Sequence, residues 1–160
     1  MKLNEKVAAL KAKCPLLFNV ADKDSHPRSG FHIRDGWFPM VERLCLMIEH
    51  QLMNYVPEEI RGEIYLAQVK EKFGSLRVYM NVSTPYIDGA IALAESLSHV
   101  TCEECGGLGE LRTSGYHKVL CDNHNKSELA RKKEEYKKYL EEQEQEKRKL
   151  VKEKMEKALK

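Results

Sequence analysis

Hydrophobic positions in the first half of the chain recur at helical spacing in two places. Leu3, Val7 and Leu10 form a short apolar stripe that must end at Cys14-Pro15, because the residue before a proline disfavours the helical conformation. Pro39 suits the first turn of a second and longer helix. The apolar stripe of that helix predicts the main core element and consists of Val41, Leu44, Cys45, Ile48, Leu52 and Tyr55.

The pattern then changes to that of a β-hairpin. From Leu76 to Val82 apolar residues alternate with polar ones, which is the period of a strand with one buried face. A partner strand is expected from Glu63 to Lys70, joined through Phe73-Gly74-Ser75. The earlier stretch from Asn19 to Gly36 is polar, contains Pro and Gly, and is expected to be a loop.

Two further helices are predicted in the second half. Thr84-Pro85 supplies an N-cap and a first helical position for a helix that ends near residues 98–100. After Arg131 the chain lacks Gly and Pro and is dominated by strong helix formers, so a long helix is expected. Its sparse apolar positions form no sustained heptad pattern, which favours a solvated helix over a coiled coil.

Composition and charge give a normal core beneath a highly charged surface. The 160 residues are 42% hydrophobic and 32% charged, with a formal net charge of only +2, so overall charge does not indicate nucleic-acid binding. Residues 131–160 contain 12 Lys and Arg against 8 Asp and Glu, a net of +4; the remaining 15 against 17 give −2 for residues 1–130. No leader and no apolar run of about 18 residues is present, so we expect a soluble, intracellular protein without membrane contact.

The clearest candidate chemistry is a set of cysteines with one histidine. Cys102 and Cys105 form a Cys-x-x-Cys pair, and after a spacer of fifteen residues Cys121 and His124 form a Cys-x-x-His pair. This spacing predicts one structural Zn²⁺, and four protein ligands leave no open position for a catalytic water. The weaker alternatives are buried reduced cysteines without metal, and His117 as the fourth ligand.

The residues around these pairs predict the architecture of the zinc module. Gly106-Gly107 suits a tight knuckle, and Gly109 and Gly115 flank a segment long enough for a hairpin arm. A helix that opens at the second pair then favours a treble clef over a zinc ribbon. The predicted fold is therefore α+β, with helices packed on a β-hairpin, followed by a treble-clef-like zinc module and a long C-terminal helix. The expected units are an α+β body (1–100), the zinc-binding module (101–128) and a charged helical tail (129–160).

Two groups of basic residues are candidate contacts for nucleic acid or a partner. Lys70, Lys72 and Arg77 surround the hairpin turn beside aromatic residues, a combination that can bind phosphates and stack bases. Solvated strand ends explain the same residues and are the favoured interpretation. Arg131, Lys132 and Lys133 form a basic cluster in the tail, although acidic residues are interspersed around it.

Catalytic residues are not predicted. The sequence has no nucleophile elbow, phosphate-binding loop or dinucleotide fingerprint, and Cys45 belongs to a core stripe rather than to a reactive site. The loop from Asp22 to Asp35 contains Asp24 and His26, which could bind a metal or transfer protons. Because its spacing matches no motif with a known mechanism, a polar surface loop is favoured and a nuclease is the least favoured function.

Three segments carry a family resemblance. They are Gly36-Trp37-Phe38-Pro39; Val69-Lys70-Glu71-Lys72-Phe73-Gly74-Ser75-Leu76-Arg77-Val78-Tyr79; and Ala94-Glu95-Ser96 leading into Cys102-Glu103-Glu104-Cys105-Gly106 and Leu120-Cys121-Asp122. Together they resemble a family of small, largely uncharacterised bacteriophage and prophage proteins, over roughly residues 36–124.

The resemblance implies a viral origin and an accessory role in the cytoplasm of an infected bacterium. Combined with the closed metal site, it leads us to expect a non-enzymatic, zinc-stabilised protein that binds a host or phage macromolecule, for instance to inhibit a bacterial defence system. No small-molecule substrate is expected. The alternative function is a DNA- or RNA-binding zinc protein that uses the basic tail.

Overall fold

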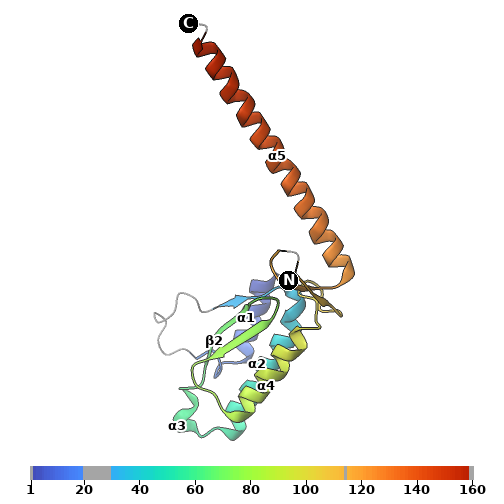
Figure 1. Ribbon diagram of the computed structural model, residues 1–160. Helices are drawn as coiled ribbons and strands as arrows, with labels where there is room; N and C mark the ends of the chain where they lie inside the picture. Colours follow the sequence, from blue (N-terminus) through green and yellow to red (C-terminus); the bar gives the residue numbers. More distant parts are fainter. Residues whose placement is uncertain (1, 20–29, 114, 159–160) are drawn as a thin grey trace. The chain divides into compact units, whose positions relative to one another are not determined.

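The computed structural model describes residues 2–19, 30–113 and 115–158, and its elements are those of a mixed α+β protein (Figure 1). Contacts within the chain separate residues 1–121 from residues 122–160, and the two units are described in turn. The elements are α1 (Leu3–Lys13), β1 (Phe31–His32), the 3-10 turn η1 (Asp35–Trp37), α2 (Phe38–Tyr55), α3 (Glu58–Arg61), β2 (Leu66–Glu71), β3 (Leu76–Met80), α4 (Pro85–Ser98), β4 (Glu110–Arg112), β5 (Lys118–Leu120) and α5 (Asp122–Ala158).

The predicted hairpin is confirmed as the antiparallel pair β2 and β3, with Lys70 opposite Arg77. Its turn is closed by two backbone hydrogen bonds between Lys72 and Ser75, of 2.8 and 3.2 Å. The two central residues have φ values of 57° and 74°, as in a type I′ turn, which matches the twist of the flanking strands. A bulge after Leu66 explains why inward-facing residues of β2 do not follow strict alternation.

The prediction that residues 19–36 form only a loop is wrong. Within it β1 adds a third strand, parallel to β2, with Phe31 opposite Val69, and η1 follows directly. Parallel strands require a long crossover, here supplied by α2 and α3. A two-residue strand has no alternation of its own, so only pairing with a distant partner identifies it. The short helix α3 was likewise not predicted.

The polar loop considered for metal or acid–base chemistry is only partly covered by the structure. Residues 20–29, which include Asp24 and His26, lie outside the described residues. Within the described part, Asp35 accepts a hydrogen bond from Lys6 at 2.8 Å and therefore serves as an ion-pair partner between η1 and α1.

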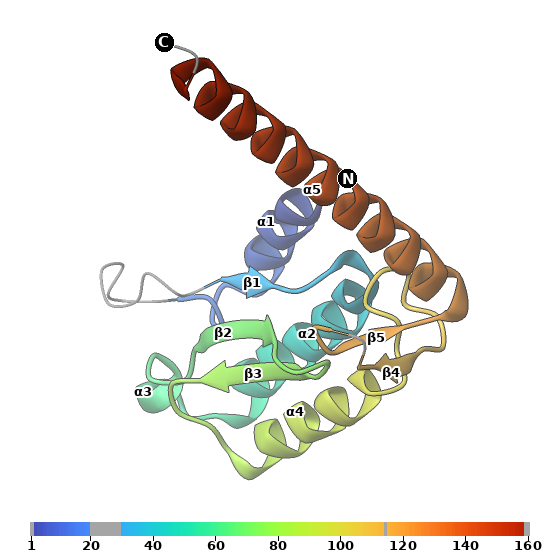
Figure 2. The same cartoon turned by 45° about the horizontal axis from the view of Figure 1, so that its top comes forward.

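The core lies between the sheet and two neighbouring helices. Figures 1 and 2 show α2 and α4 side by side against the three-stranded sheet, and α1 packs on α2. Trp37 is fully buried and its indole N–H donates to the Thr101 carbonyl at 2.7 Å, so this side chain anchors the core. Cys45 is 1% exposed, so its assignment to the core is confirmed.

Glu49 is a buried carboxylate on the apolar face of α2, and it was not foreseen. Its two oxygens accept hydrogen bonds from the backbone N–H groups of Leu16 at 3.0 Å and Leu17 at 2.9 Å. These donors follow the break at Cys14-Pro15, where the chain leaves α1 and turns beneath α2. The carboxylate therefore satisfies two backbone N–H donors of the irregular segment that follows α1.

The second unit is the single helix α5, 37 residues long. Its surface is rich in ion pairs one turn apart, including Glu144 and Arg148 at 2.8 Å. Across the described residues of the whole chain, no helix combines the length and apolarity needed to cross a membrane.

Replacing Glu49 with Ala is expected to lower the free energy of unfolding by about 3 kcal/mol, because a buried and a partly buried N–H group lose their acceptor. Glu49→Gln keeps one carbonyl oxygen and should lose less. The control is Glu42→Ala, whose partly exposed carboxylate pairs with Lys13 at 2.9 Å and should contribute less than about 1 kcal/mol. Urea unfolding provides the measurement; equal losses for Glu49→Ala and Glu42→Ala would contradict the assigned role.

Candidate metal centre

The Cys102-to-Cys105 segment folds as a tight knuckle held by its own backbone. The Gly106 N–H donates to the Cys102 carbonyl at 2.9 Å, and the Cys102 N–H donates to the Gly107 carbonyl at 2.7 Å. Gly106 has a φ of 76°, a conformation that a residue with a side chain adopts only at a cost. The Cys-x-x-Cys spacing therefore turns both thiols toward one point, as expected from the sequence.

A second glycine, distant in sequence, is packed directly against this knuckle. A Cβ atom on Gly36 would lie 2.4 Å from the Cys102 carbonyl oxygen, 2.6 Å from that of Glu103 and 2.6 Å from the Gly106 nitrogen. The Gly36 N–H also donates to the Glu103 carbonyl at 2.8 Å. Because the neighbouring atoms are all backbone, they cannot move aside as a flexible side chain would. The start of α2 and the knuckle therefore meet where only glycine fits.

A short hairpin joins the knuckle to the second pair of cluster residues. Strands β4 and β5 are antiparallel, with Leu111 opposite Val119, as the glycines flanking this segment led us to expect. The hairpin is tied to the knuckle by the Glu103 N–H, which donates to the Val119 carbonyl at 2.9 Å. Cys121 follows β5, and His124 is the third residue of α5.

The four predicted side chains come together. One ligand atom from each of Cys102, Cys105, Cys121 and His124 lies within 4.8 Å of the other three. The sulfur atoms of Cys105 and Cys121 are 4.0 Å apart, close to the separation of about 3.8 Å between two thiolates on a tetrahedral zinc ion and far beyond a disulfide bond of about 2.05 Å. The cluster can therefore hold a metal ion.

The remaining cysteines have a different environment. Cys14 and Cys45 are both buried in the main core, away from the cluster. Burial, reinforced by the nearby carboxylate of Glu49, raises the pKa of Cys14 to about 11, and burial also raises the pKa of Cys45. Both therefore remain neutral thiols near pH 7, which suits core packing rather than metal binding or nucleophilic chemistry.

Glu103, between the two knuckle cysteines, is a structural residue that the sequence did not reveal. Its side chain is 2% exposed and accepts a hydrogen bond from the Val119 N–H at 2.9 Å. Burial raises the pKa of this carboxyl group, while the Val119 hydrogen bond and the Arg34 guanidinium at 3.7 Å favour its charged form. Arg34 also pairs with the adjacent Glu104. The only sequence signal was two acidic residues inside the Cys-x-x-Cys knuckle, where spacing alone predicts exposed positions.

The candidate contacts on the hairpin separate into two kinds. The Lys70 ammonium lies 4.9 Å from the centre of the Tyr79 ring, and that of Lys72 lies 5.7 Å from the centre of the Phe73 ring. Arg77 instead turns toward α4, where its guanidinium is 3.5 Å from Glu95. The two lysines and two aromatic rings therefore form the accessible part of this surface, and Arg77 has a structural partner.

The candidate basic cluster of the tail is engaged within α5 itself. Arg131 donates to Glu128 at 3.0 Å and to Glu135 at 2.5 Å. Lys132 lies 3.9 Å from the same Glu128, and Lys133 is the next residue of this helical turn. These carboxylates offset much of the local positive charge.

Comparison of the chain with protein-family models, curated proteins and solved structures finds no match.

Replacing Gly36 with Ala should destabilise the protein by about 2–3 kcal/mol, because the added methyl group collides with the knuckle backbone. The same variant should release metal to a chelator faster. Gly89→Ala is the matched control, since a Cβ there meets nothing within 4 Å; in the middle of α4 it should stabilise by about 0.5–1 kcal/mol. Urea unfolding and chelator competition measure both effects, and unchanged behaviour of Gly36→Ala would refute the close packing.

Proposed function

We propose that Cys102, Cys105, Cys121 and His124 bind one structural Zn²⁺ in a treble-clef arrangement. The knuckle supplies the first pair, the β4–β5 hairpin follows, and the second pair spans the start of α5. Three sulfur atoms and one imidazole nitrogen are the ligand types that zinc prefers in structural sites. When bound, such an ion supplies folding energy by joining the knuckle, the residue after β5 and the first turn of α5.

We infer that the protein is a non-enzymatic binding protein that acts on a host or phage macromolecule. The completeness of the ligand set carries this proposal, because four protein ligands fill the tetrahedral positions that a catalytic zinc would need in part for water or substrate. The resemblance of residues 36–124 to bacteriophage proteins supports an accessory role in the cytoplasm of an infected bacterium. Inhibition of a bacterial defence system is the role we favour.

Nucleic-acid binding is the second candidate function, and a specific feature of the hairpin turn supports it. Phe73 is 74% exposed, yet it has a φ of 57°. A bulky residue in this left-handed conformation costs roughly 1–2 kcal/mol, and Asn, Asp or Gly is usual there. An exposed aromatic ring retained at that cost, beside Lys70 and Lys72, suits stacking on an unpaired base with phosphates nearby. For this second function we therefore propose the hairpin, rather than the tail, as the contact surface.

Purified protein is expected to contain one zinc per chain. Cys105→Ala should lose the metal and lower the melting temperature by at least about 10 °C, because the ion stabilises only the folded state. Cys45→Ala is the control: removing a buried core side chain also destabilises, but one zinc should remain. In excess chelator the parent and Cys105→Ala should melt alike. A metal-free parent, or an unchanged melting temperature for Cys105→Ala, would disprove the zinc site.

An affinity-tagged chain should retain a protein from bacterial lysate in a stoichiometric amount, and the retained protein should survive nuclease treatment. A second sample of the same complex, washed at increasing salt, serves as the comparison, because contacts to phosphates weaken steeply with ionic strength. A chain truncated after Glu128 tests whether the tail is needed.

If the retained material disappears with nuclease and elutes at moderate salt, the second candidate function replaces the first. In that event Phe73→Ala should weaken binding to a labelled single-stranded oligonucleotide about fivefold or more. Tyr86→Ala removes another exposed ring, on α4, and should leave that affinity unchanged.

A further inference from the structure

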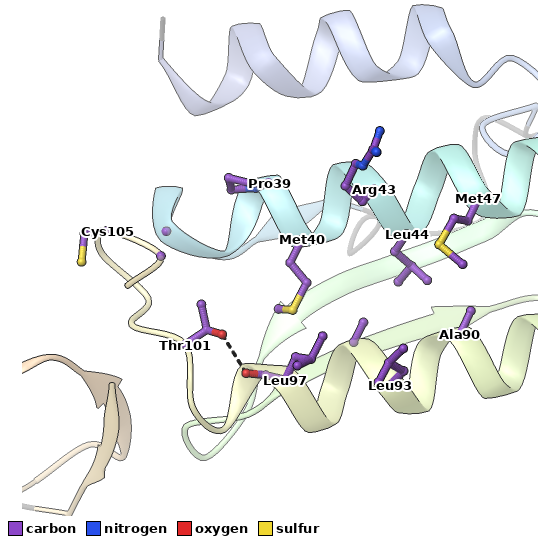
Figure 3. A pocket seen from close by; sticks show the side chains of 13 residues that line it. Pro39, Met40, Arg43, Leu44, Met47, Ala90, Leu93, Leu97, Thr101 and Cys105 are labelled. Carbon is purple, nitrogen blue, oxygen red and sulfur yellow. Dashed lines mark hydrogen bonds between the residues drawn. The ribbon is translucent and has the colours of Figure 1, made fainter. Parts of the chain in front are cut away.

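An apolar groove runs between α2 and α4 in the first unit of the chain, with a volume of about 490 Å³. Figure 3 shows Met40, Leu44 and Met47 of α2 directed toward Leu93 and Leu97 of α4. The groove shares Cys105 with the proposed zinc site, but its apolar walls on α2 and α4 belong neither to that site nor to the hairpin surface.

The groove is exposed although its lining is apolar. Met47 is 44% exposed, Leu93 60% and Leu97 45%, and all three border the same depression. Side chains of this size are usually exposed singly on a soluble domain, whereas a contiguous apolar patch marks an interaction surface. Methionine adapts its shape to the bound partner because its side chain is unbranched and flexible.

The shape of the groove fits an α-helix. On α2, Met40, Leu44 and Met47 follow i, i+4, i+7 spacing, so this wall extends about 10.5 Å, or two helical turns. On α4 the facing residues Ala90 and Ala94 are small, which lets another backbone approach closely. A helix laid between the walls would present apolar residues at i, i+3 or i+4, and i+7, the pattern of helix-in-groove recognition.

Charge at the rim indicates what kind of helix fits. Arg43 is the one charged residue among those that line the groove, and Figure 3 shows its guanidinium directed away from α4, at the edge of α2. In the described part of the chain Arg43 forms no ion pair. The acidic residues Asp88 and Glu95 belong to α4, which forms the opposite wall, but neither lines the groove. Glu95 faces β3, where it accepts from the Val78 N–H at 3.1 Å. The rim therefore offers a cation to a carboxylate on the ligand.

Two occupants from the protein itself fit less well. The apolar positions near the end of α5 lie among six Lys and Arg and two Glu between residues 147 and 158, so a segment with a net charge of +4 would meet Arg43. The same groove on a second copy is also concave, and two concave surfaces do not fill each other.

We propose that this groove binds an amphipathic helix of a partner protein, with three apolar residues spaced over two turns and a Glu or Asp beside Arg43. The proposal rests on the protein-binding function proposed above and names its surface and the chemistry of the partner. Thr101 and the knuckle residues Cys105 and Gly106 form one end of the groove, so a metal ion bound at the cluster would hold that end wall in place.

The proposal can be tested with two displayed libraries of helical peptides, presented to the full-length protein. Both libraries vary three apolar positions at i, i+4 and i+7; one fixes Glu at a flanking position and the other fixes Lys. Binders should come from the Glu library, and labelled copies of them serve as probes. Leu93→Glu should abolish their binding, while Ile60→Glu, which alters an exposed apolar residue on α3 outside the groove, should leave it unchanged.

Arg43→Ala should weaken a Glu-containing probe about fivefold and leave its Gln counterpart nearly unchanged, which isolates the charge contact. Melting temperature and zinc content of Leu93→Glu confirm that the variant is folded. The absence of binders, enrichment of the Lys library, or dimerisation that Leu93→Glu abolishes would each overturn the proposal.

The lysate experiment separates failure of the groove from failure of the proposed function. If Leu93→Glu still retains the nuclease-resistant protein partner, the binding function stands and the groove assignment is wrong. If Leu93→Glu loses that partner while Ile60→Glu keeps it, the groove is the binding surface.

Discussion

The backbone contact between Gly36 and the Cys-x-x-Cys knuckle is the constraint on which the rest of the first unit depends. It joins the start of α2 to the segment that follows α4, two regions that are more than sixty residues apart in sequence. Trp37 reinforces the contact by donating to Thr101 from inside the core. Because the main core helix begins here, any shift of the knuckle would be transmitted to α2 and to the groove beside it.

Two buried carboxyl groups also hold parts of the first unit together through hydrogen bonds to the backbone. Glu49 accepts from two backbone N–H groups after α1, and Glu103 accepts from the backbone of β5. Glu49 satisfies donors in the irregular segment after α1, and Glu103 satisfies a donor of β5, which belongs to a two-stranded sheet. These hydrogen bonds offset part of the cost of burying the two carboxyl groups. No buried side-chain nitrogen or oxygen of the described residues is left without a partner, so the irregular segments are fixed by polar contacts as well as by apolar packing.

The proposed function follows from the different positions of the metal cluster, the groove and the hairpin turn. A metal ion at the cluster would stabilise the knuckle, the knuckle supports one end of the apolar groove, and the groove and the hairpin turn are left as the accessible surfaces. Their chemistry differs: the groove is apolar with one cation at its rim, whereas the turn combines a strained aromatic ring with two lysines. The two proposals therefore assign different partners to them, a helix to the groove and an unpaired base to the turn.

The sequence by itself determined those features whose signal is local. Helical periodicity placed α2, the Thr84-Pro85 pair placed the start of α4, where the Thr84 side chain accepts from the Ile87 N–H at 3.4 Å, and ligand spacing identified the four residues of the cluster. The tertiary structure decided the parallel pairing of β1, the burial of Glu49 and Glu103, the need for glycine at position 36 and the existence of the groove. Each of these depends on atoms that are close in space but distant along the chain, so no local pattern of residues could reveal them.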